Sequence, residues 1–184
     1  MIRTLWQRTN NNQMDEGKKI AAIFATMNRA ETAMECLRRL HGQSVRPDFI
    51  VVADNRSTDE TVSGIKALGE ELRLEITVLA LKENLGNAGG IREAMDHAFR
   101  AGAGAVWILD DDSWPEPDSL KHLLDPEGPV TGIRSSMVSA PDGSGASWPL
   151  ETQAEGARWK LEWNPVRGNS GPWIRIRRAW LGIL

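Results

Sequence analysis

Three consecutive aspartates, Asp110, Asp111 and Asp112, carry the clearest chemical potential in this sequence, and they directly follow an apolar run over residues 105–109. Adjacent carboxylates repel one another unless a cation compensates their charge. In an extended segment Asp110 and Asp112 face the same way and Asp111 faces the opposite way. Two carboxylates on one side suit Mg²⁺ or Mn²⁺ and leave positions open for phosphate oxygens. We therefore predict a divalent cation held by Asp110 and Asp112, with a solvated acidic turn as the alternative.

Polar clusters also follow three other apolar runs. They are Thr26-Met27-Asn28-Arg29, Asp54-Asn55-Arg56-Ser57 and the glycine-rich segment over residues 84–90. Asp54 and Asn55 are expected to hydrogen-bond a base or a ribose, although Asp followed by Asn is also ordinary turn chemistry.

The glycines of the third cluster favour close approach of an anion. Gly86, Gly89 and Gly90 are expected to lie in front of a helix, whose N-terminus attracts negative charge. Arg92 would then meet a diphosphate from the first turn of that helix, or simply face solvent. The spacing matches neither the dinucleotide-binding glycine pattern nor the P-loop, so a Rossmann dehydrogenase and a P-loop NTPase are disfavoured.

The elements that must position these clusters can be read from two periodicities. Short apolar runs over residues 20–26, 49–53, 74–79 and 105–109 predict strands, and amphipathic runs between them predict three helices. Such units wind into an α/β fold with an open, mostly parallel sheet and helices on both faces. The four clusters should then meet at one edge of the sheet.

Helix ends are also predicted from single residues. Asn28 with Glu31 and Ser57 with Glu60 fit capping boxes, while Gly42 and Gly102 would end the first and third helices.

Composition limits the classes of protein that fit. The 184 residues carry a net charge of −3, and residues 1–129 hold 15 basic against 21 acidic side chains, which argues against nucleic-acid binding. Cys36 is the single cysteine, so no intramolecular disulfide forms. We expect a flexible segment over residues 1–17, an α/β domain over 18–128 and a further region over 129–184. The polar N-terminus and the absence of a long apolar run predict a cytoplasmic address.

Four segments together resemble the family 2 glycosyltransferases of the GT-A fold. They are IFATMNR (residues 23–29), VVADNRSTD (51–59), NLGNAGG (84–90) and WILDDD (107–112). The Gly-Gly pair and the aspartate triplet look most like galactofuranosyltransferase-type and rhamnosyltransferase-type members, which implies a part in making a cell-wall polysaccharide. Met27 and Ala53 depart from the family pattern, where an aromatic residue and an aspartate are common.

The resemblance implies a Rossmann-like fold that binds a nucleotide-diphosphate sugar, linked to UDP or dTDP, over residues 18–128. Thr26, Asn28 and Arg29 would border the nucleotide, and Asp54 and Asn55 would recognise base and ribose. Gly89, Gly90, Arg92 and Asp111 would complete the donor site, while Asp110 and Asp112 would hold Mn²⁺ or Mg²⁺. The sugar would pass with inversion to a saccharide or lipid-linked acceptor.

The catalytic base is the part of the pattern that we do not find. After Asp112 no carboxylate lies in a recognisable copy of the family's downstream acidic motif, so we expect a truncated transferase whose residues 129–184 form a partial acceptor side. A non-catalytic nucleotide-sugar-binding fragment or partner subunit remains an alternative. A sugar-phosphate nucleotidyltransferase is another, but it would need a lysine-bearing glycine-rich loop after the first strand, and residues 26–30 contain neither lysine nor glycine.

The basic C-terminal segment allows two interpretations. Arg175, Arg177 and Arg178 alternate with Ile174 and Ile176, which predicts a strand with one basic face. Peripheral association with an anionic membrane surface, at the inner face of the membrane, explains the same residues.

Overall fold

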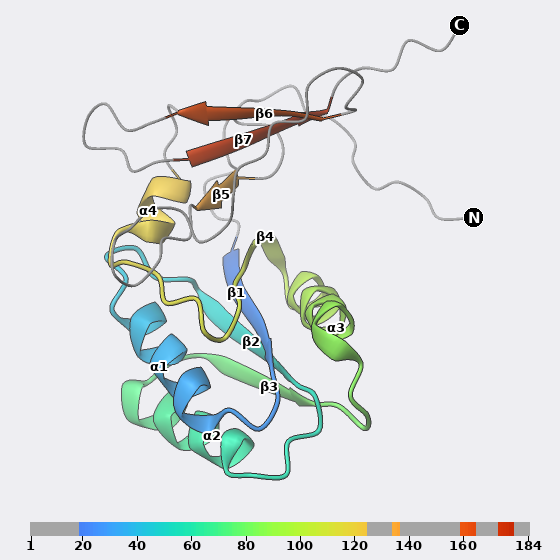
Figure 1. The fold of residues 1–184 in the computed structure, drawn as a ribbon. Coiled ribbons are helices and arrows are strands. Elements are labelled where there is room, and N and C mark those ends of the chain that lie inside the picture. The colour runs from blue at the N-terminus through green and yellow to red at the C-terminus, as the bar shows by residue number, and fades with distance from the viewer. Residues whose placement is uncertain (1–18, 125–133, 137–158, 165–172, 179–184) are drawn as a thin grey trace, which may run out of the picture.

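The computed structural model describes residues 19–124 with their side chains, and the strands 134–136, 159–164 and 173–178 by their backbone. Predictions for residues 1–18 and for the rest of 125–184 lie outside the described residues. The elements are β1 (Lys19–Thr26), α1 (Ala30–His41), β2 (Phe49–Asp54), α2 (Thr61–Leu72), β3 (Ile76–Ala80), α3 (Gly86–Arg100), β4 (Ala103–Ile108), α4 (Ser119–Leu123), β5 (Arg134–Ser136), β6 (Trp159–Asn164) and β7 (Trp173–Arg178) (Figure 1).

The first four strands form one parallel sheet in the order β3-β2-β1-β4. The chain moves outward from β1 through β2 to β3, then returns through α3 to place β4 on the other side of β1. The strand order therefore reverses between β1 and β4. In open α/β sheets ligands bind at such a reversal, beyond the carboxyl ends of the strands.

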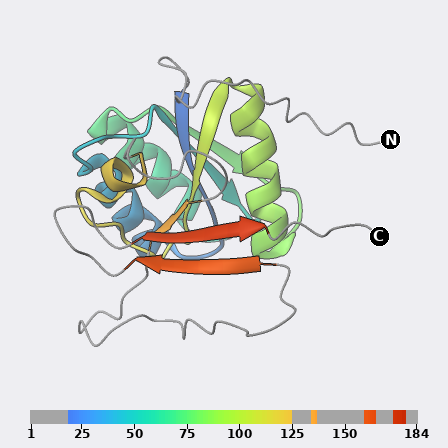
Figure 2. The ribbon, with the colours of Figure 1, turned by 90° about the horizontal axis from the view of Figure 1, so that it is seen from above.

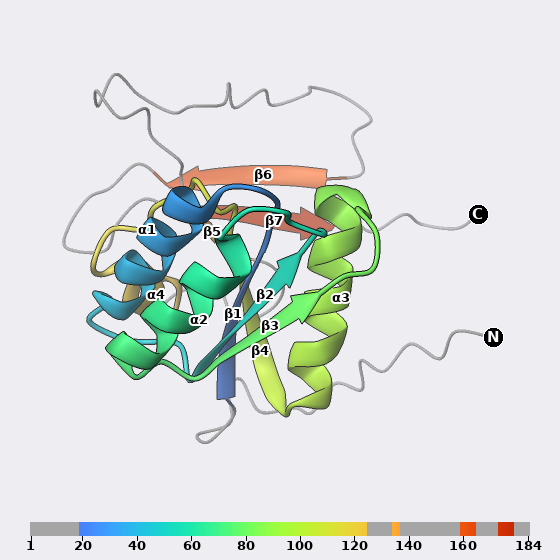
Figure 3. The same cartoon turned by 90° about the horizontal axis from the view of Figure 1, so that it is seen from below.

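Helices cover both faces of this sheet, as predicted. Figure 3 shows α1 and α2 on one side of the strands and α3 on the other. Phe24 and Val52 pack with Leu37 of α1 and Ile65 of α2 on one face. The alternate residues of β1 and β2 pack against α3 on the second face, chiefly against Ala94 and Ala98. Successive side chains of a strand point to opposite faces, so a strand with a continuous apolar run is buried on both faces of the sheet.

Three predictions about helix starts are wrong. Neither Asn28 nor Ser57 caps a helix: α1 begins after Arg29 and α2 after Glu60, and neither N-cap side chain makes a capping hydrogen bond. The third helix begins at Gly86, so the glycines lie within its first turns and not in front of it. Gly42 does follow α1 as its C-cap, and Gly102 follows α3 with a φ of +93°.

A second, three-stranded sheet comes from the C-terminal part of the chain. Its antiparallel order is β5-β7-β6, and Figure 2 shows β6 and β7 side by side. The strand predicted around Arg175 is confirmed as β7, while the orientation of its basic side chains lies outside the description. Among the described residues, no helix has the length and apolarity needed to cross a membrane.

Candidate functional site

A cleft of about 470 Å³ lies at the carboxyl ends of the parallel strands. Segments that follow β1, β2, β3 and β4 all contribute to its wall, so the predicted convergence of four polar clusters occurs. The lining residues are Ala25, Thr26, Met27, Arg29, Asn55, Asn84, Gly86, Asn87, Asp110, Asp111 and Asp112.

The aspartate triplet forms a turn in which its three side chains have different surroundings. The turn is closed by a hydrogen bond from Ser113 N to Asp110 O of 3.1 Å, so the extended conformation that we expected is wrong. Asp111 is nevertheless buried while Asp110 and Asp112 are exposed, as alternation predicted. Both Asp111 oxygens are occupied, by Thr26 Oγ1 at 2.8 Å and by Arg29 Nη1 at 2.8 Å. Asp111 therefore anchors the turn.

Arg29 is the positive charge of this cluster. Its guanidinium spans two neighbouring carboxylates, with Nη1 on Asp111 and Nη2 on Asp112 at 2.9 Å. The hydrogen bond to Asp112 and the charge of Asp111 raise the pKa of Arg29, so it stays protonated. Burial raises the pKa of Asp111, and the hydrogen bond from Thr26 and the charge of Arg29 oppose that effect. One guanidinium thus pairs with two of the three carboxyl groups.

Asp110 and Asp112 supply carboxylate oxygens, the ligand type that hard divalent cations prefer. Asp110 Oδ1 accepts a hydrogen bond of 3.2 Å from Asn87 Nδ2, and Asp112 Oδ2 accepts one from Arg29. The second oxygen of each carboxylate has no hydrogen-bond partner among the described residues. Within the same part of the chain, no group of three or more His, Cys, Asp or Glu could hold a metal. Two carboxylates with further positions left to water or phosphate is the usual arrangement for Mg²⁺.

Asn28 holds the site together from outside the cleft. It has a left-handed backbone with a φ of 52°, a conformation that Asn tolerates better than most residues. Its N–H donates to Ser57 Oγ at 2.8 Å, and its Oδ1 accepts from Thr58 N at 2.7 Å. The next residue, Arg29, donates its N–H to Thr61 Oγ1 at 3.0 Å. These bonds join the loop after β1 to the loop after β2. The polar groups of Asn28 and Ser57, which we expected to cap helices, therefore hold these two loops together.

Asn55 reaches the cleft wall, but both of its polar atoms are engaged. Nδ2 donates to Gly86 O and Oδ1 accepts from Leu85 N, each at 3.2 Å, so the amide fixes the start of α3. Asp54 is buried beside it and does not line the cleft. Its Oδ2 accepts from Ser57 N at 3.0 Å, whereas Oδ1 is buried without a partner in the described structure. A buried acceptor without a donor is costly, so this oxygen needs a ligand or a water.

The remaining predicted donor residues lie on α3. Gly90 packs against the sheet, because a Cβ there would come within 2.8 Å of Ala25 Cβ. A Cβ on Gly89 would collide with Leu85. Arg92 is exposed and pairs with Glu93 at 2.7 Å, and it does not line the cleft. The structure therefore gives the two glycines a packing role.

Five cleft residues are not among the donor-site residues that the resemblance implies, and one of them, Ala25, belongs to β1 itself. Met27, Asn84, Gly86 and Asn87 lie in the predicted polar clusters, and Asn84 Nδ2 contacts Met27 Sδ at 3.1 Å. Their position beside selected residues was the available signal. The buried Gln43 was missed altogether: its Nε2 donates to Glu116 O at 2.7 Å and its Oε1 accepts from Leu120 N at 3.1 Å. This clamp fixes the segment between the aspartate turn and α4.

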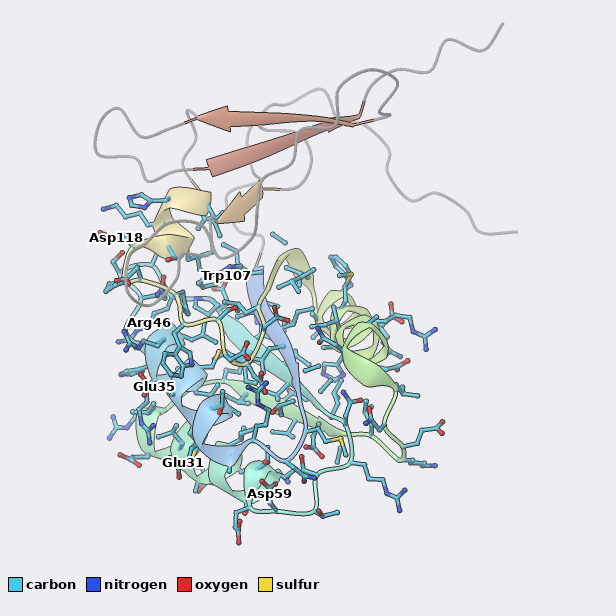
Figure 4. All side chains as sticks on the ribbon, viewed as in Figure 1. Glu31, Glu35, Arg46, Asp59, Trp107 and Asp118 are labelled. Carbon is cyan, nitrogen blue, oxygen red and sulfur yellow. The ribbon has the colours of Figure 1, made fainter. Side chains whose placement is uncertain are left out.

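No carboxylate besides the triplet lines the cleft in the described part of the chain. Asp118 bonds Ser44 Oγ at 2.5 Å next to α4. Figure 4 shows it at the opposite end of the domain from Asp59, which lies at the start of α2 near the carboxyl ends of the strands. Asp118 does not line the cleft. Glu116 is exposed and does not line the cleft either, and the side chains of the carboxylates from Asp125 onward lie outside the description.

Known proteins resemble part of this chain. A galactofuranosyltransferase, GlfT1, of Mycolicibacterium smegmatis is 30% identical over 111 residues, which are 60% of this chain and 35% of that protein. The GlfT1 of Mycobacterium tuberculosis is 33% identical over 95 residues, or 52% of this chain and 31% of that protein. The chain therefore spans about a third of the length of these curated relatives.

A solved structure shares the fold. The mannosyltransferase PcManGT of Pyrobaculum calidifontis, in complex with GDP-Man and Mn²⁺, superposes with a TM-score of 0.56 and 27% identity. The superposition covers 76% of this chain and 40% of that one. The predicted GT-A type of α/β fold is thereby confirmed. The sequence model described as "Glycosyl transferase family 2" matches residues 21–175. This chain belongs to glycosyl transferase family 2.

Proposed function

We propose that this chain binds a nucleotide-diphosphate sugar in the cleft, with Mn²⁺ or Mg²⁺ at Asp110 and Asp112, and serves transfer of the sugar to a saccharide or lipid-linked acceptor. The observation that carries the proposal is that the three carboxylates of the aspartate turn have different surroundings. Asp111 is fixed from two sides by Thr26 and Arg29, and this leaves Asp110 and Asp112 exposed in the cleft. The donor chemistry of the related mannosyltransferase, GDP-Man with Mn²⁺, points the same way.

The cleft has groups suited to each part of such a donor. A divalent cation at Asp110 and Asp112 would neutralise the negative charge that develops on the departing nucleoside diphosphate. The start of α3, where Gly86 and Asn87 line the cleft, adds a favourable helix dipole, while the Leu85 and Gly86 N–H groups are already bonded to Asn55 and Asn84. Asp54 does not line the cleft, but its buried Oδ1 has no partner in the described structure and would accept from a base N–H that reaches it. Asn55 contributes by holding α3 in position.

Inversion is the stereochemical course that we propose. The acceptor hydroxyl would attack the anomeric carbon opposite the leaving diphosphate, and a carboxylate would take its proton. The described residues supply no such carboxylate in the cleft beyond the triplet, so the general base is unassigned. We therefore expect the 184-residue chain to bind nucleotide with metal but to turn over poorly. Robust metal-dependent transfer by the purified chain would overturn that second expectation.

A thermal-shift panel tests donor binding. The purified chain is melted with UDP, dTDP or GDP, each with and without Mn²⁺, and the same panel is run on Asp112→Ala. A nucleotide present at about 100 times its Kd stabilises by roughly 2.7 kcal/mol, which is about 5–10 °C for a protein of this size. We expect such a shift for one nucleotide, only with Mn²⁺, and its loss in Asp112→Ala.

A matched control distinguishes the loss of a cleft carboxylate from the loss of a negative charge elsewhere on the protein. Asp96 is an exposed carboxylate farther along α3 and does not line the cleft, so Asp96→Ala should keep the wild-type response. The proposal fails if no nucleotide stabilises the protein with Mn²⁺, or if both alanine variants respond alike. Comparison of UDP, dTDP and GDP identifies the donor base at the same time.

A non-catalytic nucleotide-sugar-binding subunit is the second candidate function. It is favoured by the same lack of a further carboxylate in the described cleft. It predicts normal nucleotide binding with no transfer and no donor hydrolysis. Donor hydrolysis that requires Mn²⁺ and Asp112 would count against it.

A further inference from the structure

We propose that Arg29 is the resident counter-cation of the aspartate turn and exchanges partners when the donor site fills. In the free protein its guanidinium holds Asp112. When a divalent cation occupies Asp110 and Asp112, Arg29 gives up Asp112, keeps Asp111, and offers the released N–H to the diphosphate. The inference rests on the proposed function, because it concerns the same cleft.

The two ion pairs of Arg29 differ in a way that makes one of them exchangeable. The pair with Asp111 joins Arg29 to a side chain that is only 6% exposed and is also bonded to Thr26. The pair with Asp112 joins it to a side chain that is 53% exposed. Exposed pairs are screened by water and contribute little to stability, whereas a partly buried pair is screened less. Asp111 is therefore the fixed partner and Asp112 the replaceable one.

The backbone of Arg29 stays in place during such an exchange. Its N–H donates to Thr61 Oγ1, and its carbonyl accepts from Ala33 N at 2.9 Å in the first turn of α1. Movement is thus confined to the side chain, which is 46% exposed and lines the cleft. Rotation about the Asp111 contact changes the partner of Nη2 without moving the loop.

Charge gives the direction of the exchange. A guanidinium is always charged in a protein, and Arg29 Nη2 lies 2.9 Å from Asp112 Oδ2, so Arg29 would stand beside a divalent cation on the same carboxylate. The Arg29 guanidinium and a divalent cation that share the Asp112 carboxylate repel each other strongly. A diphosphate brings new negative oxygens into the cleft, and the planar guanidinium suits phosphate as well as carboxylate. Transfer of one N–H from Asp112 to phosphate relieves the repulsion and adds a bond to the donor.

The decisive measurement is Mn²⁺ binding without nucleotide, read from the free Mn²⁺ signal in electron paramagnetic resonance. We compare the wild type with Arg29→Gln and with Arg92→Gln, which removes an exposed arginine outside the cleft. If Arg29 competes for Asp112, Arg29→Gln binds Mn²⁺ at least about tenfold more tightly than the wild type. Arg92→Gln should match the wild type. Equal or weaker Mn²⁺ binding by Arg29→Gln overturns the proposal and leaves Arg29 as a fixed support of Asp112.

A second arm measures the nucleotide. With saturating Mn²⁺, the nucleotide that stabilises the wild type should bind Arg29→Gln about tenfold more weakly, because the phosphate contact is lost. Unchanged affinity in this arm refutes the transfer to phosphate. Failure of the wild type to bind any nucleotide would sink the proposed function, while the Mn²⁺ comparison would still decide whether Arg29 competes for Asp112.

A measurement on the wild type covers the case in which Arg29→Gln does not fold. The ¹⁵N signal of the Arg29 side chain is followed by NMR during addition of diamagnetic Mg²⁺, with the Arg92 signal as reference. We expect the Arg29 signal to shift with Mg²⁺ alone and again when nucleotide is added. An Arg29 signal that does not respond to saturating Mg²⁺ contradicts the exchange.

Discussion

Gly90 lies where α3 approaches the sheet most closely, and its replacement by alanine should destabilise the domain. A Cβ at this position would come within 2.8 Å of Ala25 Cβ and 3.1 Å of Asn55 Nδ2. Ala25 belongs to β1, which is hydrogen-bonded to β2 on one side and β4 on the other, so it has little room to retreat. Helix α3 must therefore move away from the sheet, and Asn55 must move with it.

The size of the effect follows from two opposing contributions. Overpacking of a core contact costs about 1–3 kcal/mol. Alanine in place of glycine inside a helix raises the free energy of unfolding by about 1 kcal/mol. Gly64 in α2 is the matched control, because its Cβ would meet only the flexible side chain of Met34, with the sulfur at 3.1 Å. Gly64→Ala keeps the helix gain with little strain, so the two variants should differ by roughly 1–3 kcal/mol.

Urea unfolding of both variants, followed by circular dichroism, measures this difference. Each kilocalorie per mole also corresponds to a change in Tm of about 2–4 °C for a protein of this size. We expect Gly90→Ala to be the less stable variant and to bind nucleotide more weakly, since Asn55 positions the start of α3. Equal stability of the two variants within about 0.5 kcal/mol would refute the close-contact argument.

Three further outcomes are expected. Burial raises the pKa of Cys36 to about 12, so the thiol stays neutral and should react with a disulfide reagent at pH 8 only as the protein unfolds; rapid stoichiometric labelling of the folded chain would contradict this. Gln43→Ala leaves Glu116 O and Leu120 N without their buried partner and should lower the free energy of unfolding by roughly 2–3 kcal/mol in urea titrations, and a loss below about 1 kcal/mol would show that the clamp is dispensable. Arg73 ends α2 with a φ of 53°, so Arg73→Gly should raise the stability by about 1 kcal/mol, and a lower urea midpoint would argue against strain there.

The central strands were predictable because they are buried on both faces. The apolar run over residues 49–53 predicts β2 to within one residue, and all six residues of β2 are buried. The edge strands were displaced by about two residues, since β3 and β4 are only partly covered and their sequences are less uniform. The bounds of a strand can thus be predicted more accurately when the strand is buried on both faces.

The start of α3 was not predictable from local preference. Glycine and asparagine disfavour a helix interior, so residues 86–90 looked like a loop. The helix begins there because contacts distant in sequence support it: Asn55 bonds Leu85 N and Gly86 O, and Gly90 fits against Ala25. Tertiary packing overrides propensity in this segment.

The capping boxes fail for a related reason. Asn28 and Ser57 have the residue types of N-caps, but the side chain of each accepts a hydrogen bond from the loop that contains the other. The convergence of the four polar clusters was predicted correctly, because the carboxyl ends of parallel strands meet at one edge of the sheet. The ion pairs of Arg29 with Asp111 and Asp112 could not be foreseen, since they join residues 82 and 83 positions apart whose side-chain directions depend on the folded loops.

The bonds between Asn28, Ser57 and Thr58 make the loops after β1 and β2 a single stiff unit. A ligand that arrives at this rim finds it already shaped, so little conformational entropy is lost there on binding. Association should consequently proceed without a slow ordering phase in these loops. Adaptation to a different donor is then more readily achieved at side chains that face the cleft, such as Met27, than by remodelling the loop backbone.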